Sequence, residues 1–201
     1  MTEEAHPPWE ASYTADRPAP WDIGRPQPAF VRLADEGRLT GRLLDAGCGT
    51  GENALLAAGR GADVIGVDIA PTAIGRARAK ASERGLAARF EVADALDLGR
   101  LGLAVDTVID SGVFHVFDDE DRARYVASLA TVLRPAGTCY LMSFSDRQPG
   151  TWGPRRVGEN ELRAAFGQGW AVESITADTF EINPMEGTAQ VRAWLAAIRR
   201  S

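Results

Sequence analysis

The chain has 201 residues, of which 45% are hydrophobic and 25% charged, as in one soluble globular domain of ordinary size. Its formal net charge of −6 leaves no basic field to recruit nucleic acid or an anionic membrane. No window approaches the roughly 20 apolar residues that span a bilayer, and the first residues show no secretory signal. Cys48 and Cys139 lack metal-ligand and redox spacing, so we expect a cytoplasmic protein with reduced thiols.

Residues 1–28 are rich in proline and aromatic residues, which predicts neither a regular helix nor a central strand. Indole rings gain much by burial, so we expect an ordered arm that lies over another part of the molecule. A helix is predicted to begin near Pro28, with Phe30, Val31, Leu33 and Ala34 on its apolar face. We therefore divide the chain into an arm, residues 1–28, and a single domain, residues 29–201.

Beyond the arm, short apolar runs alternate with helical patterns. Strands are predicted at 42–46, 63–67, 88–92, 105–109 and 138–144, and helices at 52–60, 71–84 and 119–133. This alternation predicts an α/β fold, a parallel sheet covered by helices on both faces. In the tail we expect a helix at 159–166 and strands at 170–176 and 191–198, although the last segment could equally be a short helix.

The first predicted strand runs into a glycine-rich loop with the sequence Asp-Ala-Gly-Cys-Gly-Thr-Gly, residues 45–51. Glycines at 47, 49 and 51 permit a tight turn and let a ligand approach the bare backbone. Dinucleotide-binding loops have Gly-x-Gly-x-x-Gly, and here the third glycine comes one residue early. The preceding Asp45 is unsuited to a phosphate but well suited to an ammonium group.

Two further acids follow the next two predicted strands. Asp68 can accept hydrogen bonds from both hydroxyl groups of a ribose, and Asp94 can accept a hydrogen bond from the amino group of an adenine. Taken singly, such a loop can be only a tight turn and such acids only helix caps. Together with Asp45 they fit a zwitterionic nucleoside without phosphates, and S-adenosylmethionine is that molecule.

Over about residues 38–145 the chain therefore resembles the class I S-adenosylmethionine-dependent methyltransferases. The resemblance implies a Rossmann-like, mostly parallel seven-stranded sheet with a seventh, antiparallel strand, which suits 191–198. It implies a cofactor held around the glycine loop and at the ends of the strands. The residues implied are Asp45, Gly47, Cys48, Gly49, Gly51, Asp68, Ile69, Asp94, Ala95 and Asp110.

The segment after the fourth predicted strand bears on the substrate. Enzymes that methylate amino groups of bases have an Asn/Asp-Pro-Pro-Tyr/Phe loop there, whereas this chain has Asp-Ser-Gly-Val-Phe, residues 110–114. We therefore exclude methylation of DNA amines. A metal-dependent enzyme would need converging carboxylates, but the acids at 118–121 are better explained as charge at a helix N-terminus. We expect no metal.

Residues 19–28 resemble the Trp-Asp-x-Gly-x-Pro-x-Pro arm of thiopurine and thiol methyltransferase-like enzymes. Residues 144–156 resemble a loop of a bacterial branch of that group, which methylates heteroatoms of small heterocyclic toxins. The resemblance implies an arm that closes over the cofactor as a lid, with Trp21 in contact with it. By analogy four aromatic residues would wall a planar substrate pocket: Trp9, Tyr13, Phe114 and Trp152. The alternative is an arm that merely covers the core.

His115 lies where this fold places the substrate, beyond the fourth strand. A hydroxyl group with a pKa near 10 gains from a base tuned near neutrality, so His115 is the candidate base. It could instead orient the substrate or simply pack against a neighbouring ring. Asp16 could hold its imidazole in the useful tautomer. His6 receives no role.

These observations predict a methyltransferase that modifies an oxygen or sulfur atom of a small aromatic or heterocyclic molecule, in a detoxifying role. We expect a monomer or weak homodimer. One alternative is a biosynthetic O-methyltransferase acting on a quinone or polyketide. Another is a non-catalytic protein that senses the cofactor.

Overall fold

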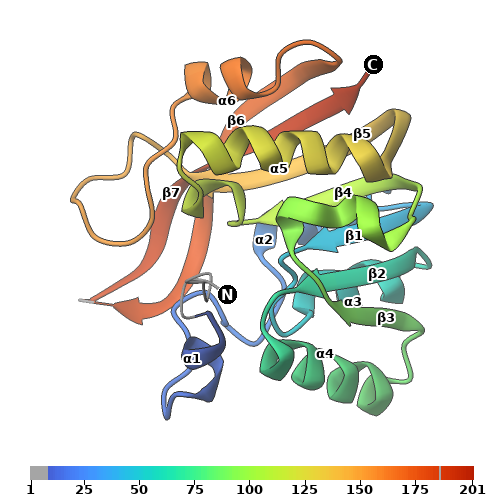
Figure 1. Ribbon diagram of the computed structural model, residues 1–201. Coiled ribbons are helices and arrows are strands. Elements are labelled where there is room, and N and C mark those ends of the chain that lie inside the picture. The colour runs from blue at the N-terminus through green and yellow to red at the C-terminus, as the bar shows by residue number, and fades with distance from the viewer. Residues whose placement is uncertain (1–8, 186) are drawn as a thin grey trace, which may run out of the picture.

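The computed structural model describes residues 9–185 and 187–201, and its centre is a seven-stranded sheet of order β3-β2-β1-β4-β5-β7-β6 (Figure 1). The strands are β1 (Arg42–Ala46), β2 (Asp63–Asp68), β3 (Ala88–Val92), β4 (Val105–Ser111), β5 (Leu133–Phe144), β6 (Trp170–Met185) and β7 (Thr188–Arg200). Strands β1 to β5 pair in parallel, and β7 is antiparallel to both of its neighbours. The predicted α/β fold with a mostly parallel sheet is confirmed.

Helices cover both faces of this sheet. They are α1 (Trp9–Thr14), α2 (Pro28–Asp35), α3 (Glu52–Gly59), α4 (Pro71–Arg84), α5 (Asp119–Val132) and α6 (Glu159–Ala165), with 3₁₀ turns η1 (Ala95–Leu101) and η2 (Phe114–Val116). Leu43 packs with α2, α3 and α4, and its neighbour Leu44 packs with α5, α6 and η1. Both faces of β1 are thus buried, which explains its continuous apolar run. None of the helices in the described residues is long and apolar enough to cross a membrane.

The arm contains a helix that we did not predict. Helix α1 occupies Trp9–Thr14, inside a stretch that is free of proline from residue 9 to residue 17. One and a half turns fit between the prolines, and tertiary contacts of Tyr13, which is buried, hold them in place. The prediction that the arm contains no regular helix is therefore wrong for these residues.

The tail is more extended than predicted. Strand β6 was expected to end at 176 but continues to Met185, because β7 pairs with it as far as Met185↔Thr188. The helical alternative for 191–198 is wrong, since Leu195 pairs with Met142 of β5. Strand β5 begins at Leu133, five residues earlier than expected, through an irregular register with β4.

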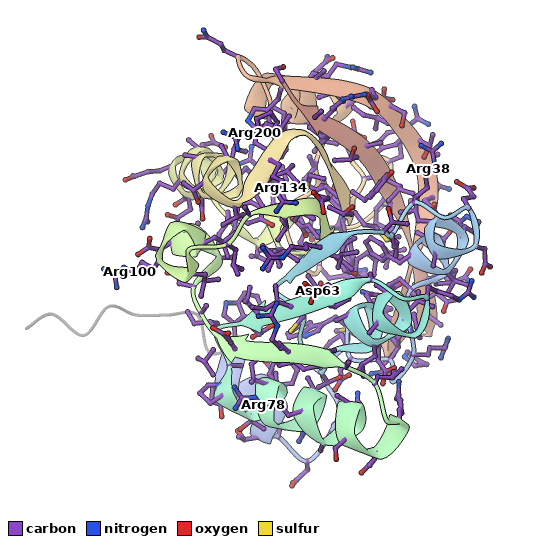
Figure 2. The ribbon with its side chains drawn as sticks, turned by 90° about the vertical axis from the view of Figure 1, so that its right-hand side faces the viewer. Arg38, Asp63, Arg78, Arg100, Arg134 and Arg200 are labelled. Carbon is purple, nitrogen blue, oxygen red and sulfur yellow. The ribbon has the colours of Figure 1, made fainter. Side chains whose placement is uncertain are left out.

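Charged pairs gather at the amino ends of the strands. Asp63, the first residue of β2, lies 3.4 Å from Arg42 and 3.5 Å from Arg89, and Asp106 of β4 pairs with Arg134. Figure 2 faces this end of the sheet and labels Asp63 and Arg134 among its charged side chains. Exposed pairs of this kind add little stability. The glycine loop lies at the opposite, carboxyl end.

Candidate functional site

The glycine loop, residues 47–51, connects β1 to α3 with positive φ angles at Gly47, Gly49 and Gly51. A Cβ atom added to Gly47 would lie 2.1 Å from Cγ2 of Val113. One added to Gly49 would lie 2.9 Å from the hydroxyl of Tyr13. The loop is therefore contacted closely from two sides, by the segment after β4 and by the arm, and only glycine fits.

Asp45 lies in β1 directly beneath this loop and is 1% exposed. Within the described residues neither of its carboxylate oxygens has a hydrogen-bond partner. Burial, assisted by the neighbouring carboxylates of Asp110 and Asp68, raises its pKa well above the ordinary value. A buried carboxylate without donors is costly unless it takes up a proton or a cation approaches it. Its chemistry thus fits an ammonium group.

Asp68 ends β2 and fastens the glycine loop to that strand. Its Oδ2 accepts the Gly49 N–H at 2.8 Å and its Oδ1 accepts the Ala70 N–H at 2.9 Å. Burial raises its pKa. Each carboxylate oxygen retains a further lone pair, so the side chain can still accept hydroxyl groups of a ligand.

Asp94 follows β3 and caps the turn η1, where its Oδ1 accepts the Leu96 N–H at 2.8 Å. Its partly buried side chain has a second oxygen, for which no bond is formed among the described residues. Ala95 and Ile69 are also partly buried near these strand ends. The helix-cap role and the adenine role are thus compatible at Asp94, because they use different oxygens.

Asp110 was predicted to bind the cofactor, and the structure gives it another role. It is fully buried, and its oxygens accept the N–H groups of Val113 and Phe114 and the hydroxyl of Tyr125. Burial raises its pKa to about 6. Since the protein's own donors surround it and it lines neither described cavity, Asp110 shapes the segment after β4.

Aromatic residues of the arm cover the glycine loop. The Trp21 ring meets the Trp9 ring edge-on at 5.5 Å and the Tyr13 ring at 6.3 Å. The Trp21 indole N–H donates to the Tyr13 hydroxyl at 2.9 Å. These three rings therefore pack as one unit, and Tyr13 is the member that contacts the glycine loop, at Gly49.

Between arm and loop lies a narrow cavity of about 60 Å³. Its walls include Trp21 and Arg25 of the arm, Cys48 of the loop, Ser111 of β4 and Phe180 of β6. Burial raises the pKa of the Cys48 thiol, which makes it a poor nucleophile. Neither Ser111 nor Phe180 was predicted to line the site. Phe180 was missed because the sequence pattern ended the predicted strand at residue 176.

The arm is fastened to two elements that are distant in sequence. The Gln27 side chain bonds both backbone groups of Glu181, at 2.8 and 2.9 Å, and the Asn183 Nδ2 donates to the carbonyls of Ala19 and Asp22. On the other side, Glu10 accepts from Thr72 of α4, and Arg76 donates to the Tyr13 carbonyl at 2.6 Å. The pairs join segments more than 50 residues apart, so single-sequence patterns could not reveal them.

The predicted pairing of Asp16 with His115 is wrong. Asp16 is exposed and lines a separate groove of about 490 Å³ beside Arg76 and Lys80 of α4. His115 is 5% exposed and lies on η2, where its Nδ1 accepts the Phe144 N–H at 3.0 Å. The ring nitrogen that Asp16 would hold is thus already occupied by a backbone donor.

Aromatic rings surround His115. Phe144 of β5 meets it edge-on at 4.9 Å, and the Phe180 ring lies 6.2 Å away. Burial, followed by the charges of Arg122 and Arg156, lowers the His115 pKa to about 3. The imidazole is therefore neutral at physiological pH.

The two remaining predicted pocket residues lie in different places. Phe114 is fully buried on the other face of the sheet, 5.8 Å from the Phe166 ring and under the Arg122 guanidinium, so its predicted pocket role is wrong. Trp152 is partly buried 6.3 Å from the Phe144 ring, on the same side as His115. Sequence adjacency of 114 and 115 concealed that the two side chains point to opposite sides.

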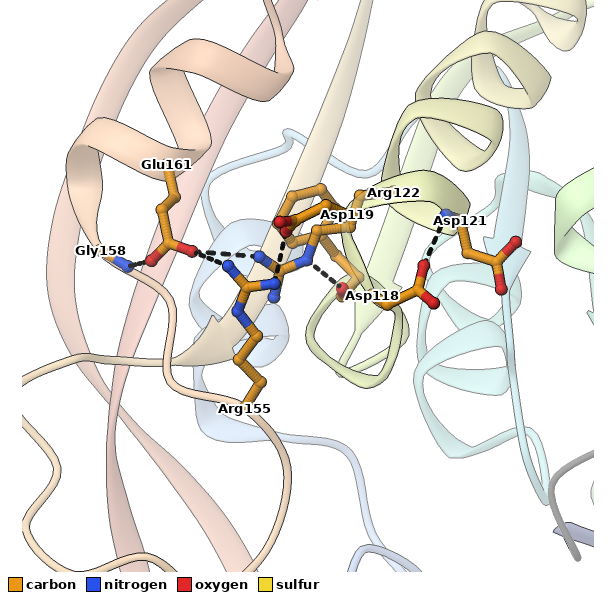
Figure 3. A network of polar contacts seen from close by, with 8 residues as sticks. Asp118, Asp119, Asp121, Arg122, Arg155, Gly158 and Glu161 are labelled. Carbon is orange, nitrogen blue, oxygen red and sulfur yellow. Dashed lines mark hydrogen bonds and ion pairs between the residues drawn. The ribbon is translucent and has the colours of Figure 1, made fainter.

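A charged network fixes the loop that carries Trp152 (Figure 3). Glu161 of α6 accepts from Arg155 at 2.6 Å and from Arg122 of α5 at 3.2 Å, and also from the Gly158 N–H. Asp119 accepts from Arg155, while Asp118 caps α5 by accepting the Asp121 N–H. The acids at 118–121 thus serve the helix terminus. Among the residues described, no three His, Cys, Asp or Glu side chains are grouped to hold a metal ion.

Comparisons with known proteins agree with this geometry. A family model described as "Methyltransferase domain" matches residues 43–137. A 2-heptyl-1-hydroxyquinolin-4(1H)-one methyltransferase of Mycobacteroides abscessus is 38% identical over 190 residues, 88% of this chain and 82% of that protein. A probable thiol methyltransferase 2 of Arabidopsis thaliana is 27% identical, covering 96% of this chain and 87% of that protein.

Solved structures are similar over most of the chain. One described as "Conversion of a Disulfide Bond into a Thioacetal Group during Echinomycin Biosynthesis" is 41% identical with a TM-score of 0.86, covering 96% of this chain and 91% of that one. The magnesium protoporphyrin IX methyltransferase of Synechocystis with bound S-adenosylhomocysteine is 25% identical with a TM-score of 0.67, covering 86% and 80%.

Proposed function

Because the chain belongs to the S-adenosylmethionine-dependent methyltransferases, we propose that it methylates an oxygen or sulfur atom of a small aromatic or heterocyclic molecule. The named relatives support both acceptor atoms, since one acts on a hydroxyquinolinone and another is a probable thiol methyltransferase. The fold and the cofactor are those of the family. The acceptor class is our proposal.

The observation that carries this proposal is the aromatic lining around the glycine loop. Trp21 and Phe180 line the cavity, Phe144 lies beside Phe180 and His115, and Trp152 lies beside Phe144. Flat apolar walls favour a planar apolar ligand with few polar groups. Among the polar groups that could orient it are Ser111 and Arg25, which line the cavity, and His115, which lies beside Phe180.

We propose that the three acids divide the cofactor among them. Asp45 faces the ammonium group, Asp68 accepts the ribose hydroxyls, and the free oxygen of Asp94 accepts the adenine amino group beside Ala95 and Ile69. Gly47, Cys48, Gly49 and Gly51 surround the methionine part. When bound, S-adenosylmethionine supplies an electrophilic methyl group on a sulfonium sulfur. Asp45 is the residue whose chemistry is hardest to explain without such a ligand, because its buried charge has no donors.

Asp45→Asn tests this division. The loss of one charged contact to an ammonium group should weaken S-adenosylhomocysteine binding by about tenfold to a hundredfold in calorimetry. Because the variant also removes a buried unpaired carboxylate, it should unfold at a higher temperature than the wild type without ligand. Unchanged affinity would show that the ammonium group is held elsewhere.

In this proposal the arm, residues 1–28, is a lid over residues 29–201, with Trp21 near the sulfonium end. A lid excludes water and holds the reacting atoms close together, which supplies much of the rate in a transfer of this kind. Detoxification of heterocyclic compounds in the cytoplasm, by a monomer or weak homodimer, is the corresponding physiological role.

The decisive experiment is S-adenosylhomocysteine production against aryl thiols, N-hydroxyquinolones, hydroxyquinolines, flavonoids, quinols and catechols. Turnover of thiols or hydroxyquinolones at the highest kcat/KM supports the proposal. Preference for a quinol or polyketide-like phenol would favour a biosynthetic enzyme. Tight cofactor binding with no turnover of any acceptor would favour a sensor and overturn the proposal.

A further inference from the structure

The orientation of the His115 ring is fixed by a group that can act only as a donor. Its Nδ1 lies 3.0 Å from the backbone nitrogen of Phe144, the last residue of strand β5, and accepts the hydrogen bond of that N–H. A backbone amide keeps its proton, so Nδ1 must offer its lone pair. The neutral imidazole therefore carries its own proton on Nε2. A base needs a free lone pair on the nitrogen that faces the substrate, and Nε2 has none.

The Nε2 edge faces the side of the molecule where the cavity lies. A Cβ atom at Gly112 would lie 3.1 Å from Nε2 and 3.3 Å from Cζ of Phe180, which lines the cavity together with Ser111. Gly112 has a φ of +92°, which favours glycine, so no side chain of residue 112 lies between Nε2 and the Phe180 ring. His115 itself is 5% exposed and lines neither described cavity, so a ligand reaches Nε2 beside Phe180 only when the site widens. Among residues 9–185 and 187–201, no hydrogen bond to Nε2 forms.

The charges around this ring are positive. Arg122 of α5 and Arg156 of the loop after β5 both act on it, while β5 and β6 present the uncharged rings of Phe144 and Phe180. Arg122 is paired with Glu161. Arg156 forms no ion pair within the described residues, because its N–H groups donate to the carbonyls of Gln148, Gly150, Trp152 and Pro154. An uncompensated cation near the site favours an anionic ligand.

We propose that His115 donates its Nε2–H to a methyl acceptor that is already ionised, a thiolate or the oxyanion of an acidic hydroxylated heterocycle, and does not act as a base. This inference rests on the proposed function and specifies its substrate class. The low pKa of His115 agrees with it, since a ring with a pKa of about 3 takes up a proton poorly at neutral pH.

The chemistry balances without a proton transfer. A lone pair of the ionised acceptor forms the bond to the methyl carbon as the carbon–sulfonium bond breaks, and the sulfur keeps the electron pair of that bond. The negative charge of the acceptor and the positive charge of the sulfonium cancel. Acceptors that ionise near or below neutral pH are therefore the expected substrates, whereas phenols with a pKa near 10 are poor ones.

The first test reads the tautomer directly, in the full-length protein without ligand. The chain has two histidines, His6 and His115, so ¹⁵N–¹H correlation spectra of the wild type and His6→Ala assign both rings. We expect Nδ1 of His115 to be bare and Nε2 protonated, unchanged from pH 5 to pH 8. A proton on Nδ1, or a titration near pH 6.5, would overturn the inference whatever the enzyme methylates.

The second test compares His115→Gln with His115→Ala. The amide nitrogen of glutamine can replace the Nε2–H donor but cannot act as a base. For an acidic thiol or N-hydroxyquinolone, His115→Ala should lower kcat/KM by about a hundredfold, as the loss of one such donor does. The kcat/KM of His115→Gln should be about tenfold higher than that of His115→Ala. If both variants unfold at the wild-type temperature and lose kcat/KM equally, His115 acts as a base and the donor role is wrong.

The pH dependence separates the two roles as well. Across acceptors of different acidity, the pH of half-maximal kcat/KM in the wild type should follow the pKa of each acceptor. One fixed pH for all acceptors would point to a titrating protein group and overturn the donor role. If no acceptor is methylated, the proposed function fails with the donor role, while the tautomer measurement still tests the ring geometry.

Discussion

Asp45 and Asp110 lie on neighbouring strands, and Asp110 is in register with Ala46. Both carboxylates are almost fully buried, yet Asp110 accepts three protein donors and Asp45 none among the described residues. Asp110 therefore stabilises the protein's own backbone, whereas Asp45 is complete only with an external cation. Two acids predicted to share one role differ because local donors decide what a buried carboxylate does.

The raised pKa of Asp110 makes a stability prediction. Its folded-state pKa is about 6 against an ordinary 3.8, so between these values the folded protein holds a proton that the unfolded chain has released. The free energy of unfolding should therefore fall as pH rises through this window, by up to about 3 kcal/mol. Asp110→Asn lacks this titration.

Denaturant unfolding of both proteins from pH 4 to pH 7 provides the measurement. The stability of the wild type relative to Asp110→Asn should decrease over this range, with most of the change below pH 6. A relative stability that increases with pH would mean that the hydrogen bonds of Asp110 outweigh its burial and that the sign is reversed.

For single residues, the sequence predicted where side chains lie along the strands better than it predicted which groups surround them. The order of Asp45, Gly47, Asp68 and Asp94 follows from the strand pattern, and the structure places all four at the carboxyl end of the sheet. The tautomer of His115 depends on an amide 29 residues away. Phe114 was misplaced because the turn η2 sends successive side chains to opposite sides.

Among the elements, the β6–β7 hairpin and the arm depend on each other. The side-chain amide of Gln27 bonds the N–H and carbonyl of Glu181, as the backbone of a neighbouring strand would. The Asn183 side chain donates to the carbonyls of Ala19 and Asp22 in the arm. The salt bridge between Arg25 and Glu181 lies beside these bonds. The hairpin therefore fixes the segment of the arm that carries Trp21, so Asn183 is a positioning residue.

Asn183→Ala removes two side-chain bonds to the arm and keeps the backbone bond to Pro20. Since each bond contributes about 1 kcal/mol, S-adenosylhomocysteine affinity should fall by up to about thirtyfold, and chymotrypsin should cleave faster after Tyr13 and Trp21 of the arm. Asn160→Ala on exposed helix α6 is the matched control and should change neither property. Identical cleavage rates in both variants would show that the hairpin does not hold the arm.

Local patterns predicted the strands and α-helices between 42 and 132 to within a few residues, whereas the 3₁₀ turns η1 and η2 were not predicted. The β6–β7 hairpin was predicted less well. Residues 177–185 alternate only weakly and include Pro184, and they are held in a strand by their partner β7 rather than by propensity. The arm helix α1 has the same character, because α4 holds it through Glu10 and Tyr13.

For the whole molecule, the position of the arm limits access to the site. The cavity of about 60 Å³ is smaller than the roughly 300 Å³ or more that small-molecule ligands occupy. We therefore expect the arm to open before a nucleoside enters. In stopped-flow experiments, the rate constant observed for S-adenosylhomocysteine binding should reach a plateau as ligand concentration rises. Trp9 and Trp21 provide the fluorescence signal.

Tyr13→Ala should raise this plateau severalfold, because it removes the contact between arm and glycine loop. Thr14→Ala changes an exposed residue of the same helix and serves as the control. A rate that increases linearly with concentration in the wild type would show that the site is open before the ligand arrives. The mostly parallel seven-stranded sheet was predictable from the sequence. The closeness of the arm was not, since it depends on packing between distant segments.

The bond between Gln27 and Glu181 joins residues that are 154 positions apart. On the ribosome, the arm is synthesised first but receives its anchor only when the β6–β7 hairpin has emerged. A chain that ends before this hairpin lacks Glu181 and Asn183, so it cannot form the bonds that fasten the arm. Closure of the site should therefore depend on completed translation, and we expect a chain that ends before β7 to bind its ligand weakly.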